Sequence, residues 1–214
     1  MRILIACAAL YREGGRWYVY EAVQPVQLTP FSEWTKRGKD GHFVVKRLRD
    51  RKVLTPAALA RMKTVAERYR GRDYDLYFSW SDDRIYCSEL VWKIYQTATR
   101  LEIGKLQKLR DFDLSHPAVR QKMRERYGTK IPSAEPVISP SAMFDSGLLI
   151  EVVRRSLSST IRSFPHCGNL DDYWAFRTPL IRRFAAMGRE ARVEGLRTEP
   201  PAGFSALTLP AIVP

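Results

Sequence analysis

The sequence contains few cysteines and no long hydrophobic run. Only three cysteines occur among its 214 residues, namely Cys7, Cys87 and Cys167. They are too few for a disulfide scaffold, and their odd number leaves at least one thiol free unless it pairs between chains. No apolar stretch approaches the roughly 20 residues that a transmembrane helix needs. Zinc-finger spacings, RNP-type motifs and glycine-rich phosphate loops are also missing, so we expect no specific nucleic-acid partner.

The chain is strongly basic and rich in hydrophobic residues. It has 36 Lys and Arg against 23 Asp and Glu, a formal net charge of +13. The basic residues are spread among acidic ones, which favours a weak attraction to anionic polymers or a membrane surface over dedicated nucleic-acid binding. A hydrophobic content of 45% and an aromatic content of 11% exclude wholesale disorder and predict one domain, or one domain plus an extension. None of these features determines the oligomeric state.

The first residues resemble the start of a signal peptide but favour a hairpin. Met1–Leu10 pairs one Arg with an apolar run, which Tyr11–Gly15 interrupts too early for a secretory signal. We therefore expect a strand at Ile3–Tyr11, a turn at Gly14-Gly15 and a returning strand at Arg16–Val23. Without a convincing export signal, the chain as written predicts cytoplasmic retention.

Local patterns predict further elements, followed by a change in composition. A strand is expected at 42–48 and an extended aromatic segment at 74–80. Helices are expected at 56–70, 87–100 and 117–127, with Thr55 and Ser115 as the caps of the first and last of these helices. Beyond residue 153 the sequence becomes Ser-rich and then Arg-rich without clean periodicity. We expect one domain over 1–153, and a basic, partly disordered extension over 154–214 that lies outside the catalytic core.

Cys87 precedes the most regular helical pattern in the chain and is the candidate nucleophile. The N-terminus of a helix carries partial positive charge and unsatisfied N–H groups. These lower the pKa of a nearby thiol and can hold an oxyanion that forms when the thiolate attacks a carbonyl. The alternative is that Cys87 is a small buried hydrophobic residue, which is a common fate of a free cysteine.

Several sequence blocks in order resemble one family of hydrolases. Over roughly residues 6 to 152 the chain resembles the YiiX/YaeF group of permuted NlpC/P60 (papain-like) cysteine hydrolases. The blocks that carry the resemblance are 18–26, 41–45, 74–78, 80–83, 86–92, 111–114, 126–128 and 137–140. The resemblance implies an α+β fold in which a small antiparallel sheet packs against the helix that starts at Cys87.

The resemblance also implies roles for two residues and a class of substrate. Cys87 would be the nucleophile, and Glu21 the acidic partner that orients a catalytic histidine. The substrate would be a cell-envelope peptide or a lipid-like acyl compound, cleaved at an amide or ester. No cofactor or metal is implied, and the family suggests the cell envelope or periplasm as the compartment.

The sequence departs from the family pattern where the histidine should be. The family has His-x-Gly on the first hairpin strand, and counting back from Glu21 leads to Ala6 in Ala6-Cys7-Ala8. The chain could be truncated or mis-started, could be a catalytically silent binding module, or could use another histidine such as His42. The hydrolase interpretation further requires that Cys87 Sγ lies outside sealed apolar packing and that Glu21 faces it from the same side of the sheet.

Overall fold

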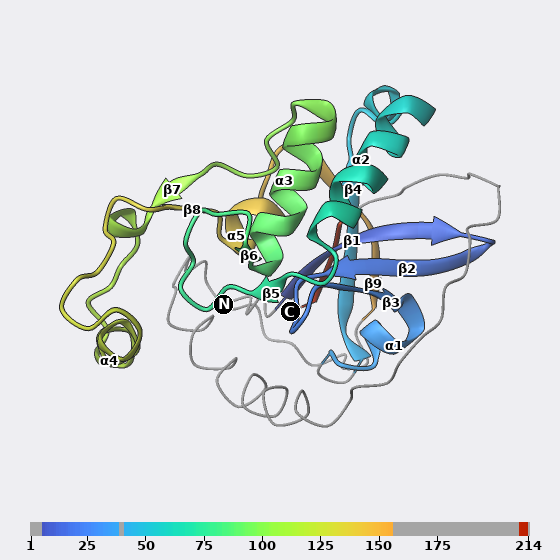
Figure 1. Ribbon diagram of the computed structural model, residues 1–214. Helices are drawn as coiled ribbons and strands as arrows, with labels where there is room; N and C mark the ends of the chain where they lie inside the picture. Colours follow the sequence, from blue (N-terminus) through green and yellow to red (C-terminus); the bar gives the residue numbers. More distant parts are fainter. Residues whose placement is uncertain (1–5, 39–40, 156–209, 214) are drawn as a thin grey trace.

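A six-stranded antiparallel sheet forms the centre of the fold in the computed structural model, which describes residues 6–38, 41–155 and 210–213 (Figure 1). The strands follow the order β3-β2-β1-β10-β4-β9 across the sheet. Their bounds are β1 Ala6–Glu13, β2 Arg16–Glu21, β3 Gln27–Pro30, β4 Phe43–Leu48, β9 Leu149–Arg155 and β10 Pro210–Val213.

The predicted hairpin at the start of the described chain is confirmed. Strands β1 and β2 pair antiparallel, with Ala9 opposite Tyr20. The turn is made by Gly14 and Gly15, with φ of +55° and +79°. This left-handed conformation is open to glycine at little cost, and it lets two strands reverse in a short turn. Residues 3–5 of the predicted first strand lie outside the part of the chain that the structure describes.

Helices cover both faces of this sheet. Helices α2 (Pro56–Tyr69) and α3 (Cys87–Thr99) lie on one face, and the short helix α1 (Phe31–Thr35) lies on the other (Figure 1). Because side chains alternate along a strand, Cys7 and Ala9 of β1 belong to the core under α3, whereas Ala8 packs with Trp34 of α1. The fold therefore has two hydrophobic layers on opposite sides of one sheet.

Helices α2 and α3 begin where the sequence predicts. Pro56 is the first residue of α2, and the Thr55 hydroxyl accepts the Ala58 N–H at 3.2 Å, which satisfies one free donor of the first turn. Along α3 the predicted apolar face is fully buried, including Leu90 and Ile94. Burial of this face ties α3 firmly to the sheet, because each buried aliphatic side chain contributes about 1.5 to 3 kcal/mol.

Contrary to the sequence prediction, the segment 74–80 is not extended along its length. Only Asp73–Tyr74 is a strand (β5), and it pairs in parallel with β6 (Arg84–Ile85). Beyond it the Asp75 carboxylate accepts the Tyr77 N–H at 2.7 Å and the Ser79 hydroxyl at 2.9 Å, so the chain turns instead of extending. An aspartate whose carboxylate accepts the backbone N–H two residues later forms a local turn. Here this turn outweighs the β propensity of the aromatic residues.

The remaining elements lie between α3 and β9. A small arm is formed by β7 (Gln107–Lys108), β8 (Pro136–Val137) and α4 (Pro117–Tyr127), and α5 (Pro140–Phe144) packs near α3. Short 3₁₀ turns occur at Arg51–Val53 and Leu109–Asp111. Ser115 is not the cap that was expected for α4, since the helix begins at Pro117 and the Ser115 N–H instead donates to Asp113 Oδ1 at 2.9 Å.

The expected extension over 154–214 contributes residues to the sheet at both of its ends. Arg154 and Arg155 complete β9, and Pro210–Val213 form β10 between β1 and β4, with Ala6 opposite Val213 and Val45 opposite Ala211. Residues 156–209 and 214 are outside the described part of the chain. Within the described ranges, no helix is both long enough and apolar enough to cross a membrane.

Candidate active site

Cys87 is the first residue of α3. The chain arrives through β6, and Tyr86 takes the extended N-cap position with φ −100° and ψ 167°. The thiol therefore lies in the first turn, where backbone N–H groups lack intrahelical acceptors and the helix dipole is positive. Cys87 is only 1% exposed and belongs to the apolar core on the α3 side of the sheet. The position favours a thiolate, whereas the burial opposes it, and the requirement that Sγ lie outside apolar packing is not met in this structure.

The neighbours of Cys87 bind the start of α3 to the segment before α5. The Ser88 hydroxyl donates to the Ile138 carbonyl at 2.8 Å, and the Ile138 N–H donates to the Tyr86 hydroxyl at 3.1 Å. The Tyr86 ring lies 4.8 Å from the Phe78 ring, and burial raises the pKa of its hydroxyl well above the ordinary value. These contacts favour a packing role for Tyr86 over donation to an oxyanion.

The structure does not bring Glu21 and Cys87 to the same face of the sheet. Glu21 follows Val19 in the alternation along β2, and Val19 packs in the layer that contains Trp34 of α1. The Glu21 carboxylate is buried and accepts the Thr29 hydroxyl at 2.5 Å and the Arg37 guanidinium at 2.5 Å. Both partners belong to β3 and the segment after α1, so the contacts of Glu21 do not support its predicted catalytic role.

The described histidines have neighbours elsewhere in the fold. The pKa of His42 is lowered, chiefly by burial, and its charged neighbours are Arg154 and Glu151 of β9, the edge strand three places from β1. His116 precedes α4, and His166 falls among the residues that the structure leaves undescribed. Ala6, at the expected position of the family histidine, is the first residue of β1.

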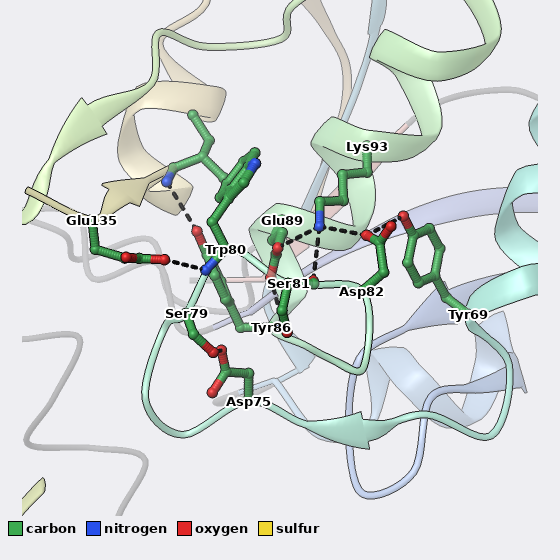
Figure 2. A network of polar contacts seen from close by, with 11 residues as sticks. Tyr69, Asp75, Ser79, Trp80, Ser81, Asp82, Tyr86, Glu89, Lys93 and Glu135 are labelled. Atoms are coloured by element: carbon green, nitrogen blue, oxygen red, sulfur yellow. Dashed lines mark hydrogen bonds and ion pairs between the residues drawn. The ribbon is translucent and has the colours of Figure 1, made fainter. Parts of the chain in front are cut away.

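A polar network lies next to Cys87 that sequence reasoning did not identify as part of the site. Figure 2 shows Glu89 of α3 beside Lys93, with Lys93 reaching Asp82 and the Ser81 carbonyl. The Lys93 ammonium lies 2.8 Å from Glu89 Oε1 and 2.7 Å from Asp82 Oδ1. Burial raises the pKa of Glu89 to about 8, although Lys93 opposes this shift. The sequence signal was the acid and base four residues apart within a helix whose flanking positions are apolar.

The loop that leads to Cys87 is anchored along its length. Asp75 is fully buried, and its carboxylate shapes the turn at Tyr77 and Ser79. The Trp80 N–H donates to the Glu135 carboxylate at 2.5 Å (Figure 2). The Trp80 ring meets the Trp92 ring edge-on at 5.4 Å. Hydrogen bonds therefore hold the segment 75–83 in place before the start of α3.

Comparison with known proteins identifies the family. Residues 6–153 match the model of a family described as permuted papain-like amidase enzyme, YaeF/YiiX, C92 family. The chain belongs to this family. The predicted membership of the YiiX/YaeF family and the predicted α+β fold are thereby confirmed. The family match supports a thiol hydrolase in general.

Two relatives from Escherichia coli illustrate the match. The uncharacterized protein YiiX of strain K12 is 47% identical over 137 residues, which cover 64% of this chain and 67% of that protein. A crystal structure described as metalloprotein yiiX from strain O157:H7 is similar with a TM-score of 0.64 and 45% identity, over 68% of this chain and 80% of that one.

The described residues do not offer a metal site of their own. Within 6–38, 41–155 and 210–213, no group of three or more His, Cys, Asp or Glu side chains is arranged to hold a metal ion. Asp82 and Asp83, the adjacent acids of the loop, do not form such a group, and Asp82 pairs with Lys93 and accepts the Tyr69 hydroxyl at 2.9 Å. The description as a metalloprotein therefore applies to the relative and is not transferred to this chain.

Proposed function

We propose that this chain is a thiol-dependent hydrolase of amides or esters in which Cys87 is the nucleophile. The observation that carries the proposal is the position of Cys87 as the first residue of α3 in a chain that matches the amidase family over residues 6–153. Substrates of the class suggested by the family resemblance are cell-envelope peptides or lipid-like acyl compounds.

The proposed reaction follows acyl transfer through a thioester. The Cys87 thiolate attacks the carbonyl carbon, and the oxyanion of the tetrahedral intermediate is stabilised by backbone N–H groups at the start of α3. The amine or alcohol leaves with a proton, and the acyl group remains on Sγ. Water then attacks the thioester and releases the carboxylic acid and the free thiol.

Two features of the structure slow this reaction. Cys87 is 1% exposed, so acylation requires a movement that uncovers Sγ. Ala6 occupies the position of the family histidine, so the proton of the thiol has no imidazole acceptor at that position. Because removal of one member of a catalytic set costs orders of magnitude in rate, we expect slow turnover.

A second candidate function is a catalytically silent binding module. The observation that favours it is Glu21, whose carboxylate is engaged by Thr29 and Arg37 on the sheet face away from α3. A carboxylate held in this way is used for structure, and the chain would then keep the family fold without its acid–base pair.

One experiment separates the two candidates. The protein is mixed with a p-nitrophenyl acyl ester, and the release of p-nitrophenolate is followed together with the intact mass. The hydrolase proposal predicts a burst and an acyl adduct on the peptide that contains Cys87. The adduct should be lost in Cys87→Ser and kept in Cys7→Ser, which changes a second buried thiol of the same core. No adduct on Cys87, together with a thiol that titrates like free cysteine, would establish the silent module.

Restoring the histidine provides an independent test. The family resemblance predicts that the Ala6→His variant raises the rate of ester hydrolysis, although the β1 residues that pack on the α3 side are Cys7 and Ala9. The increase should vanish when Ala6→His is combined with Cys87→Ser. An increase that survives in the double variant would assign the activity to the new histidine alone and would contradict the role of Cys87.

A further inference from the structure

Glu89 is a buried carboxyl group that the proposed reaction does not use. It is the third residue of α3, two residues after Cys87, and its side chain is 0% exposed. Burial of an ionisable group costs several kcal/mol unless the group is paired and hydrogen-bonded. An apolar residue would fill this place in the core without that cost, so the contacts of the carboxyl group indicate what it does.

The first contact joins Glu89 to the residue before Cys87. Glu89 Oε2 accepts the backbone N–H of Tyr86 at 3.4 Å, a long hydrogen bond of the kind that a third-position acid makes to the N-cap residue. This bond bridges the peptide unit that enters Cys87. It restrains the backbone at the point where the direction of the Cys87 side chain is set.

The second contact joins Glu89 to the loop ahead of the helix. Glu89 Oε1 lies 2.8 Å from the Lys93 ammonium, and the same ammonium donates to the Ser81 carbonyl at 2.9 Å and to Asp82 at 2.7 Å (Figure 2). The Lys93 ammonium also lies 5.0 Å from the centre of the Trp80 ring. One carboxyl group is thus connected to both chain segments that lead into the nucleophile.

We propose that Glu89 is a positioning residue that holds the first turn of α3 and thereby keeps the Cys87 thiol in the field of the helix N-terminus. This inference rests on the proposed function of Cys87 as the nucleophile. It adds that the geometry of the nucleophile depends on a side chain that never touches the substrate.

The raised pKa of Glu89, about 8 through burial, agrees with this role. Near neutral pH the group is largely uncharged, so it does not oppose the negative charge of a Cys87 thiolate. Its carbonyl oxygen can still accept the Tyr86 N–H in the neutral form. A carboxyl group that stays neutral can hold the helix start without an electrostatic penalty on the nucleophile.

The test compares two substitutions of Glu89 by the alkylation rate of Cys87. The rate of iodoacetamide reaction is measured against pH, peptide by peptide, in wild type, Glu89→Gln and Glu89→Ala. The amide of Gln can accept the Tyr86 N–H and carries no charge, whereas Ala can do neither. A positioning role predicts that Ala shifts the alkylation midpoint upward by about one pH unit, a roughly tenfold loss of rate near pH 7. Gln should leave the midpoint at or below the wild-type value.

Other outcomes overturn the inference in recognisable ways. If Glu89 acted only through its charge, both substitutions would shift the midpoint downward. Equal midpoints in all three proteins would also contradict a positioning role. Should Glu89→Ala fail to fold, hydrogen exchange of the amides around Tyr86 to Leu90 in Glu89→Gln decides the question, since positioning predicts wild-type protection and a charge-only role predicts faster exchange.

The controls separate this inference from the proposed function. Glu125→Gln removes an exposed acid of α4 that pairs with Lys122 three residues earlier, and it should leave the Cys87 profile unchanged. A wild-type Cys87 that titrates like free cysteine would refute the proposed function whatever the variants do. A wild-type midpoint below that of free cysteine, with no upward shift in Glu89→Ala, would refute only the positioning role.

Discussion

The buried Glu89 makes the stability of the protein depend on pH, and Glu89→Gln should remove this dependence. The pKa of Glu89 is raised from 4.5 to about 8, so the folded protein retains a proton that the unfolded chain releases. Below pH 4.5 both states are protonated and Glu89 imposes no penalty. As the pH rises towards 8, the unfolded state loses its proton first, and the free energy of unfolding falls by about 1.4 kcal/mol per pH unit. The penalty saturates above the folded pKa.

The magnitude follows from the width of this window. The penalty amounts to about 3 kcal/mol at pH 7 and to between about 4 and about 5 kcal/mol above pH 9, as an order of magnitude. The interaction with Lys93 is already contained in the raised pKa of Glu89, and replacement of the carboxyl group by an amide changes the stability further by an amount that does not depend on the titration of Glu89. The decisive quantity is therefore the difference between variant and wild type as a function of pH. This difference should move in favour of the variant by about 4 kcal/mol between pH 5 and pH 9.

Urea unfolding at several pH values, followed by tryptophan fluorescence, measures this difference. Glu125→Gln is the matched control, because the exposed Glu125 has a pKa lowered by Lys122 and titrates below this window. Its stability relative to wild type should be constant from pH 5 to pH 9. A constant difference for Glu89→Gln as well would refute the argument, since it would mean that Glu89 is ionised in the folded protein already at pH 5.

Three further substitutions probe the fold around the site. Glu21→Gln should reduce the free energy of unfolding by between about 1.5 and about 3 kcal/mol in urea, because its hydroxyl and guanidinium donors lose a charged acceptor; unchanged stability would contradict its structural role. Gly104→Ala should lower the thermal midpoint strongly, because φ is +83° and an added Cβ would lie 2.8 Å from the backbone nitrogen of Met143. Gly128→Ala should lower the thermal midpoint less, because an added Cβ there would meet no atom within 4 Å. Equal shifts in the two variants would refute the predicted clash. Tyr86→Phe should reduce the free energy of unfolding, measured in urea, by between about 1 and about 3 kcal/mol, because the buried Ile138 N–H loses its hydroxyl acceptor. A smaller reduction would show that this hydrogen bond is not needed for stability.

Elements that depend on neighbouring residues could be predicted from the sequence. The hairpin turn at Gly14-Gly15 and the start of α2 at Pro56 follow from local conformational preferences. The helix that begins at Cys87 follows from apolar spacing over three turns. These signals lie within one element, so they do not require knowledge of how the elements pack.

Features that depend on distant residues could not be predicted in this way. Strand β10 joins β1 and β4 although it lies far from both in sequence. Glu21 alternates with Tyr20, yet both faces of the sheet are covered, so alternation alone does not tell which side α3 occupies. The resemblance to the family implied that Glu21 faces the nucleophile. The contacts with Thr29 and Arg37 show where the carboxylate lies in this chain, and a catalytic role for Glu21 stays a prediction.

The two halves of a thiol–imidazole pair depend on different parts of this fold. The position of the thiol depends on the start of α3, which Ile138 contacts through Ser88 and Tyr86 and which Glu89 links to the preceding loop. The base would come from β1, whose first described residue is Ala6. The hydrogen bonds of Ser88, Tyr86 and Glu89 that hold the nucleophile therefore do not involve the start of β1. It follows that a failure of Ala6→His to raise the rate has two structural causes in this fold, namely the burial of Cys87 and the alternation along β1, in which Cys7 and Ala9 rather than Ala8 pack on the α3 side.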